Sequence, residues 1–262
     1  MNLLYKFFVS FISHSGQVDP SLNLLLIAVL GILVNIPAVI VFRRLIDRKS
    51  LLSLGFQFKK YERHAYSGLL TAAFIFGLGT LILVSSGFLH FIDFNFSGQD
   101  LMLYLLIMAL VAISEETVVR GYILNNLLES VPKWIALLIT AVLFSLLHWF
   151  NPGITWMSLL GIFTGGILLG LNYIYTKNLW FGIFLHFAWN YLQGPVLGYE
   201  VSGIETDSML IQSISGPVWL TGGPFGFEAS LLSTLIILPV IFLFYIFYKK
   251  NELALIRNAN NL

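Results

Sequence analysis

The chain alternates between long apolar runs and short polar segments. A helix needs about 20 residues to cross a hydrocarbon core of about 30 Å, and about seven runs reach or approach that length. The pattern therefore predicts an all-α fold, a polytopic bundle of about seven transmembrane helices. The predicted spans are Leu22–Phe42, Tyr66–Ile92, Leu101 to about Glu129, Pro132–Phe150, Ile154–Thr176, Leu179–Leu192 and Glu228–Tyr248.

The composition agrees with a membrane protein. Hydrophobic residues make up 58% of the chain and charged residues 10%, and the mean hydropathy is +0.86. Such a chain cannot cover itself with a polar surface, so the lipid bilayer is its expected surrounding. A net charge of +1 with scattered lysines argues against a nucleic-acid partner. The absence of cysteine excludes disulfides, thiolate metal sites and cysteine nucleophiles.

Basic residues lie on one side of the predicted bundle. Seven of them fall between the first two spans, namely Arg43, Arg44, Arg48, Lys49, Lys59, Lys60 and Arg63. Cytoplasmic loops are rich in Lys and Arg, so this loop is predicted to be cytoplasmic. Alternating from there puts Lys133, Lys177 and Lys249 on the same side. The prediction is an N-terminus outside and a C-terminus in the cytoplasm.

Three apolar runs contain ionisable residues far from their ends. Glu115 and Glu116 interrupt the third run, His148 lies in the fourth, and His186 lies in the sixth. The helical rise places Glu115, His148 and His186 between about 14 and about 24 Å from the cytoplasmic end of the bundle. Ionisable groups at such depth are functional by default and face water or each other. We therefore expect a central polar cavity.

Helical spacing separates the two adjacent acids. Arg120 follows Glu116 by four residues, so the two share a helix face and are predicted to form an ion pair. Glu115 is rotated from Glu116 by about 100° and points elsewhere. Glu115 is therefore the acid expected to be free for chemistry.

Three motifs occur in order along successive predicted spans. They are EExxxR at Glu115–Arg120, FxxxH at Phe144–His148 and HxxxN at His186–Asn190. Each is weak alone, but the three in this order and separation are specific. They resemble the CPBP family of intramembrane endopeptidases, the CAAX proteases and bacteriocin-processing or Abi proteins. The resemblance covers roughly Leu101–Tyr248, and Gly222–Glu228 also looks like members of that family.

The resemblance implies a role for each motif residue. Hydrolysis needs a base that removes a proton from water, and donors that stabilise the tetrahedral oxyanion. In this family's pattern Glu115 is the general base and His148 helps to hold the water. His186 and Asn190 resemble the pair that stabilises the oxyanion. Structural support is expected from Glu116, Arg120 and Phe144.

A metal-dependent mechanism is the alternative within this reading. Glu115, His148 and His186 make up two imidazoles and one carboxylate, a set that holds catalytic zinc in metalloproteases. The HExxH spacing of many zinc proteases is absent. The expected cofactor is therefore none or a divalent metal such as zinc, and the metal-independent glutamate mechanism is slightly favoured.

The resemblance also implies an organisation of the chain and a setting. Residues 1–100 are expected to hold an interfacial segment at Met1–Ser13 and two accessory helices, 101–248 the catalytic bundle, and 249–262 a cytoplasmic tail. The implied location is the cell membrane of a prokaryote. The implied partner is a membrane-associated peptide or protein substrate, either prenylated or bacteriocin-like.

Two other classes of protein remain open. A proton-coupled transporter would be expected to show internal repeats, and the two halves of the chain show no convincing repeat. A non-catalytic membrane immunity or scaffold protein of the same fold would not need the polar set. His148 on its own would be read as a packing residue, because polar side chains often link membrane helices. The co-occurrence of the motifs favours the protease.

Overall fold

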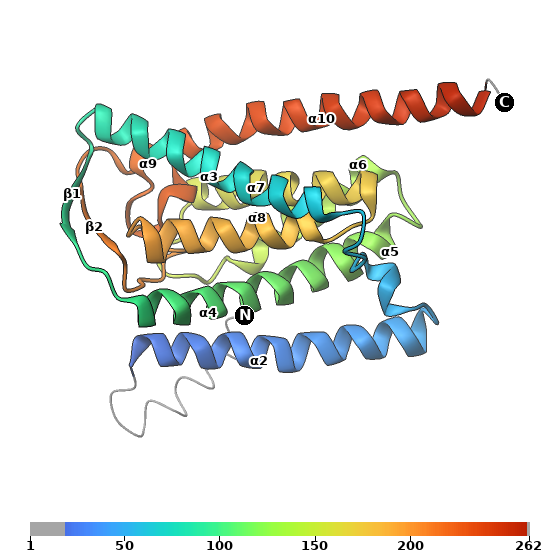
Figure 1. Cartoon of the computed structure of the whole chain (residues 1–262), viewed down its shortest axis with the longest axis horizontal. Helices are drawn as coiled ribbons and strands as arrows, with labels where there is room; N and C mark the ends of the chain where they lie inside the picture. The colour runs from blue at the N-terminus through green and yellow to red at the C-terminus, as the bar shows by residue number, and fades with distance from the viewer. Residues whose placement is uncertain (1–18, 261–262) are drawn as a thin grey trace.

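The protein is a bundle of long helices that lie side by side (Figure 1). The computed structural model describes residues 19–260, with side chains as far as residue 252, so Met1–Ser13 lies outside it. The predicted all-α bundle is confirmed. Its main helices are α2 (Pro20–Val41), α3 (Glu62–Ser85), α4 (Gly98–Glu116), α6 (Lys133–Leu147), α7 (Trp156–Thr176), α8 (Trp180–Tyr191) and α10 (Leu231–Asn260).

Short helical segments extend or connect these helices. Three of them are π-helical and continue a long helix directly: η2 (Phe42–Ile46), η4 (Thr117–Leu124) and η5 (Leu192–Val196). The others are η3 (Leu51–Leu54), α5 (Asn125–Leu127), α9 (Val218–Thr221), η6 (Gly223–Phe225) and η7 (Phe227–Ala229). π-helical turns are rare and are frequent at functional sites. The π-helical segment η4 begins directly after Glu116, so the third predicted span has this feature of functional sites next to its two acids.

In the described part of the chain, five continuous helical segments are long and apolar enough to cross a membrane. They are Pro20–Ile46, Glu62–Ser85, Gly98–Leu127, Trp156–Thr176 and Leu231–Glu252. The protein is thus an integral membrane protein. The fourth and sixth predicted spans contain shorter helices, α6 with 15 residues and α8 with 12. A helix of 15 residues rises only about 22 Å, so the count of about seven spans stays a prediction.

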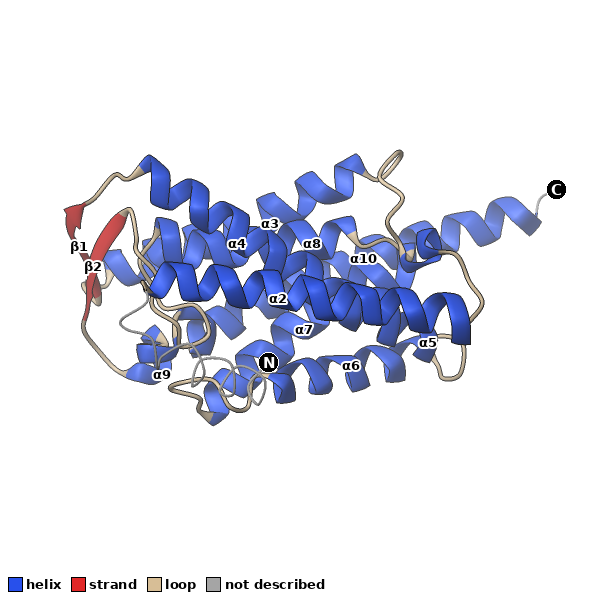
Figure 2. Cartoon of the chain, turned by 90° about the horizontal axis from the view of Figure 1, so that it is seen from below, coloured by secondary structure: helices blue, strands red, loops and turns tan. Residues whose placement is uncertain are grey.

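The second predicted span extends beyond the end of the corresponding helix in the structure. It was expected to reach Ile92, but α3 ends at Ser85 and Leu89–Phe94 forms strand β1. This strand pairs antiparallel with β2 (Leu210–Ile214), and the small sheet lies at one end of the bundle (Figure 2). Gly87, with φ of 75°, has the left-handed backbone that commonly follows a helix. Phe and Ile then favour an extended strand.

Close helix packing depends on small residues. Helix α3 packs along α8, α6 along α7, and α2 along α4. A side chain at Gly68 would come 2.5 Å from the Phe181 carbonyl oxygen, so glycine allows α3 and α8 to approach. On α7, Gly166 lies against Ala141 of α6, and small residues at such a contact let two helices approach closely. Its neighbour Gly165 has no such contact and instead lines a cavity.

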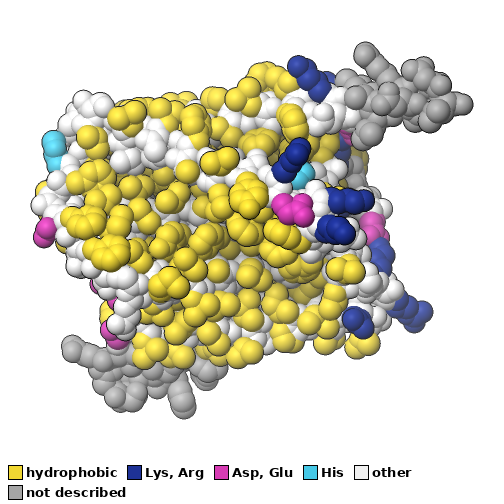
Figure 3. Space-filling view, viewed as in Figure 1, with side chains coloured by type: hydrophobic (Ala, Val, Ile, Leu, Met, Phe, Trp, Pro, Cys, Tyr) yellow, Lys and Arg dark blue, Asp and Glu magenta, His cyan; other side chains and the backbone are white. Residues whose placement is uncertain are grey.

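The outer surface suits lipid contact. Large apolar side chains are exposed along the sides of the bundle, such as Leu33 at 62% and Leu243 at 65% (Figure 3). Lysine and arginine side chains gather at the end where the C-terminus lies, and the β1–β2 sheet lies at the opposite end. The basic residues that the sequence places in loops on one side therefore lie together at one end of the bundle.

Candidate active site

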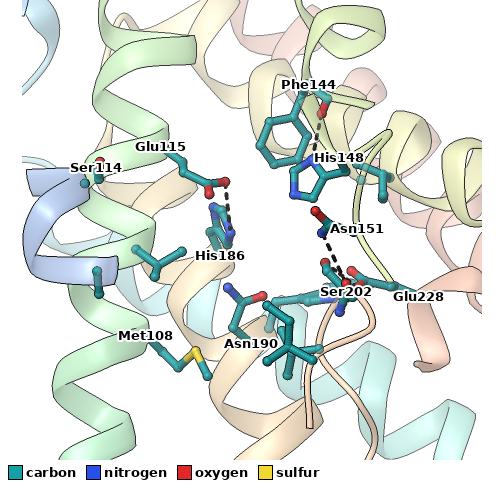
Figure 4. Close-up of a pocket in the computed structure, with 18 of the residues that line it drawn as sticks. Met108, Ser114, Glu115, Phe144, His148, Asn151, His186, Asn190, Ser202 and Glu228 are labelled. Carbon is teal, nitrogen blue, oxygen red and sulfur yellow. Dashed lines mark hydrogen bonds and ion pairs between the residues drawn. The ribbon is translucent and has the colours of Figure 1, made fainter. Parts of the chain in front are cut away.

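A cavity of about 150 Å³ lies inside the bundle, and all four predicted catalytic residues line it. Figure 4 shows Glu115 and His186 on one wall, with Asn190 below them, and His148 on the facing wall. Glu115 comes from α4, His148 follows α6, and His186 and Asn190 come from α8. Three helices separated in the sequence thus bring two imidazoles, a carboxylate and an amide to one space.

Glu115 faces His186. Its Oε2 lies 4.0 Å from His186 Nε2, and the Glu115 side chain is 23% exposed against 8% for His186. Glu115 belongs to the last turn of α4, just before the π-helical η4. The carboxylate is therefore open to the cavity and close to an imidazole nitrogen, without forming a tight ion pair.

The second glutamate is fully buried and connects two partners. Glu116 Oε1 accepts a hydrogen bond from Arg120 Nη1 at 2.8 Å, so the ion pair expected from their spacing is present. The same oxygen lies 3.0 Å from His186 Nδ1, a contact that spacing along one helix did not predict. A carboxylate paired with a cation acts as an acceptor, so Nδ1 carries a proton and donates a hydrogen bond to Glu116. His186 Nε2 is left to face Glu115.

Phe144 supports both neighbouring groups. The guanidinium carbon of Arg120 lies 4.3 Å from the centre of the Phe144 ring, in the geometry of a cation–π contact. Arg120 Nη2 also donates to the Gly166 carbonyl at 3.2 Å. The Phe144 ring meets the His148 ring edge to face, with centres 4.9 Å apart. The first residue of the FxxxH motif therefore packs against both the Arg120 guanidinium and the His148 ring.

His148 is oriented by the end of its own helix. Helix α6 ends at Leu147, and His148 Nδ1 lies 2.8 Å from the Phe144 carbonyl oxygen. A carbonyl only accepts, so Nδ1 carries the proton and the neutral ring has its acceptor at Nε2. The nitrogen of His148 that acts as an acceptor is therefore Nε2.

Several polar residues of the cavity were not assigned a role from the sequence. Glu228 Oε1 accepts from Ser202 N at 2.8 Å and from Ser202 Oγ at 2.7 Å. Asn151 Nδ2 donates to the Ser202 carbonyl at 3.1 Å. On the other side Asn35 of α2 donates to Ser114 Oγ at 2.9 Å.

Some of these residues left a signal in the sequence. Asn35 interrupts the middle of the first apolar run, and Asn151 belongs to an Asn-Pro-Gly break. Glu228 was placed at the start of the last span, whereas it lies in η7 ahead of α10. Ser202 left no signal that distinguishes it from other loop serines.

The predicted zinc ligands do not gather into a metal site. Among residues 19–252 no three His, Cys, Asp or Glu side chains lie close enough to hold a metal ion. Glu115 and His186 are 4.0 Å apart across the cavity from His148 (Figure 4). The side chains as positioned do not fit a bound zinc. Metal dependence stays a prediction.

Part of the chain matches a protein-family model. Residues 96–192 match the model described as type II CAAX prenyl endopeptidase Rce1-like. This segment is therefore similar to the Rce1-like family. The match confirms the resemblance to CAAX proteases over this segment, which covers a little over a third of the chain. No curated protein and no solved structure gives a significant match.

The Rce1-like segment contains the three motifs and hence all four predicted catalytic residues. Helices α2, α3 and α10 lie outside it, as does Gly222–Glu228. The cavity is thus lined both by residues of the matched segment and by residues outside it. The motif residues come from the matched segment, and Asn35, Ser202 and Glu228 come from parts of the chain without a match.

Proposed function

We propose that the protein is an intramembrane endopeptidase of the CAAX protease type, which hydrolyses a peptide bond of a membrane-associated peptide or protein. The observation that carries this proposal is the Glu115 carboxylate facing His186, with the acceptor nitrogen of His148 on the opposite wall of the same cavity. The Rce1-like segment that contains these residues supports it.

The attacking water would lie between Glu115 and His148. Both groups are acceptors, so each can bind one of the two protons of the water. Glu115 takes one proton as general base while the oxygen forms a bond to the carbonyl carbon. His148 Nε2 holds the other proton and thereby directs the oxygen lone pair. Glu115 then delivers its proton to the nitrogen of the leaving amine as the C–N bond breaks.

The negative oxygen of the tetrahedral intermediate needs donors on the other side of the carbonyl. His186 and Asn190 lie on one face of α8, four residues apart, and both line the cavity. His186 Nδ1 already donates to Glu116, so a donor role for Nε2 requires a second proton on the ring. With Glu115 and Glu116 ionised and Arg120 cationic, the doubly protonated His186 makes the group neutral overall. Donors fixed before the reaction are the most effective ones.

The surroundings of the site suit a substrate that arrives through lipid. Side chains of α2 and α4 form an apolar wall of the cavity, including Leu24, Ile27, Ile107 and Met108. We propose that the basic end of the bundle faces the cytoplasm, with the N-terminus outside, in the cell membrane of a prokaryote. Prenylated and bacteriocin-like peptides are the proposed substrates.

Reconstituted protein tests this function directly. Vesicles containing the wild type are mixed with a library of membrane-tethered peptides, and products are read by mass spectrometry. Glu115→Gln and His148→Ala are expected to abolish cleavage, whereas Glu205→Gln, an exposed acid outside the cavity, is expected to retain it. Cleavage that survives both cavity substitutions would overturn the mechanism. Activity that persists after stringent chelation would support the glutamate mechanism over the zinc alternative.

A further inference from the structure

The cavity contains a second carboxylate that the mechanism does not use. Glu228 lines the cavity together with Glu115, and the residue is only 9% exposed. It lies in η7 (Phe227–Ala229), outside the Rce1-like segment. Figure 4 shows it with Ser202 on the side of the cavity where Asn151 lies.

Three segments fix the position of this carboxylate. Glu228 Oε1 accepts two hydrogen bonds from Ser202, whose φ of 53° is uncommon for a residue other than glycine. The Ser202 carbonyl accepts from Asn151, and the backbone N–H of Asn151 donates to the His148 carbonyl at 2.9 Å. The backbone of Glu228 also packs tightly against α7 at Gly161. Glu228 is therefore held rigidly on the side of the cavity that carries His148.

Only one of the two oxygens of Glu228 has a partner in the described part of the chain. Both hydrogen bonds fall on Oε1, and no Lys, Arg or His side chain among the described residues lies within 4.0 Å of the carboxylate. Among the residues whose side chains are described, no lysine or arginine lines the cavity. A carboxylate can accept hydrogen bonds at both oxygens, so Oε2 is left as an acceptor without a donor among the described residues. A buried anion without a countercharge is unfavourable, so a cation in the cavity would stabilise it.

We propose that Glu228 is a specificity residue that binds a cationic group of the substrate through Oε2. The group is an ammonium or a guanidinium, carried by a lysine or arginine side chain or by a free N-terminus. This inference rests on the proposed function, because it assumes that a peptide occupies the cavity. It goes beyond that function by naming a charge that the peptide must carry near the bond to be cut.

Glu228→Gln separates this role from a structural one. The amide oxygen of glutamine can accept the same two hydrogen bonds from Ser202, while the negative charge is lost. Glu205→Gln is the matched control, since it removes one acid from an exposed position of the loop that also holds Ser202. Both variants are combined with Glu115→Gln, so that no peptide is consumed during a binding measurement.

The experiment measures equilibrium binding of fluorescent membrane-tethered peptides to protein in vesicles. One position at a time carries Lys, Gln or Glu, and each peptide is made with a free and an acetylated N-terminus. We expect the cationic peptide to bind about tenfold more tightly than the neutral one, which corresponds to one charge-assisted hydrogen bond. The preference should persist in Glu205→Gln and disappear in Glu228→Gln. The acetylated peptides show whether a side chain or the N-terminus supplies the charge.

Two results would overturn the proposal. The first is equal binding of Lys and Glu peptides at every position together with equal binding of peptides with free and acetylated N-termini. This result is obtained with Glu228 intact, so it does not depend on the folding of a variant at that residue. The second is a preference for cationic peptides that survives Glu228→Gln. Failure of the proposed function has a different signature, because it appears as absence of cleavage by the wild type whatever the binding preference.

Discussion

Glu116 Oε1 lies 3.0 Å from His186 Nδ1, so the glutamate that neutralises Arg120 also orients an imidazole of the cavity. One buried oxygen thus serves two donors on two helices. This contact keeps a proton on Nδ1, because an ionised carboxylate only accepts, so the second proton that the mechanism requires is the one on Nε2. The two adjacent acids of α4 therefore meet the same histidine, Glu116 at Nδ1 and Glu115 at Nε2.

Glu116→Gln is expected to lower kcat by about 10²- to 10⁴-fold, the range seen when a catalytic histidine loses its orienting acid. The substitution removes the negative charge that stabilises the second proton on the His186 ring, so the oxyanion would lose a cationic donor. KM should change little, since Glu116 is fully buried and does not line the cavity. Steady-state kinetics with a cleavable tethered peptide measure both constants. A matching loss in Glu129→Gln, an exposed acid paired with Lys49, would contradict this specific role.

Arg120→Gln is expected to destabilise the fold by about 3–5 kcal/mol, because it leaves a buried carboxylate without its cation. The two side chains of this pair are 1% and 0% exposed. The comparison is Lys49→Gln, which breaks an exposed pair with Glu129 and should cost at most about 1 kcal/mol. Denaturant unfolding in mixed micelles gives both free energies. Equal losses in the two variants would mean that burial does not set the strength of the Glu116–Arg120 pair.

His148→Asn is expected to keep the fold and lose activity. The asparagine amide nitrogen occupies nearly the same position as Nδ1 and can still donate to the Phe144 carbonyl. It offers no acceptor at the position of Nε2, so the water would lose one of its two partners. We expect turnover to fall by about 10²- to 10⁴-fold with little change in the unfolding midpoint. Turnover close to that of the wild type would show that Nε2 is not needed.

The contacts that could be predicted from the sequence are local ones. The Glu116–Arg120 pair follows from four-residue spacing on one helix, and the long helices follow from the apolar runs. The helical rise along the predicted spans also indicated that Glu115, His148 and His186 lie at similar depths in the bundle. Their common cavity agrees with that expectation.

Contacts between elements were beyond prediction, because they depend on how helices rotate and how loops close. The Glu116–His186 bond requires the particular rotation of α8 against α4. The strand at Leu89–Phe94 reads as the end of an apolar run until its partner 120 residues later is known. Ser202 meets Glu228 only because a loop folds back over the end of the cavity.

Two glycines of α7, Gly161 and Gly165, provide a matched test of how tightly Glu228 is held. A methyl group at Gly161 would come 1.9 Å from the Glu228 carbonyl oxygen, whereas one at Gly165 would meet no atom within 4 Å. Alanine favours a helix over glycine by about 0.8–1.0 kcal/mol. Gly165→Ala is therefore expected to raise the free energy of unfolding by up to that amount.

Gly161→Ala should instead lower the free energy of unfolding, because the backbone of η7 must move away from α7 and carry Glu228 with it. Peptide binding by this variant is expected to lose its preference for positive charge, while Gly165→Ala retains that preference and only narrows the cavity. Denaturant unfolding and the binding measurement with Lys and Gln peptides read the two effects separately. If Gly161→Ala binds both peptides as the wild type does, the close contact with α7 does not hold Glu228 in place.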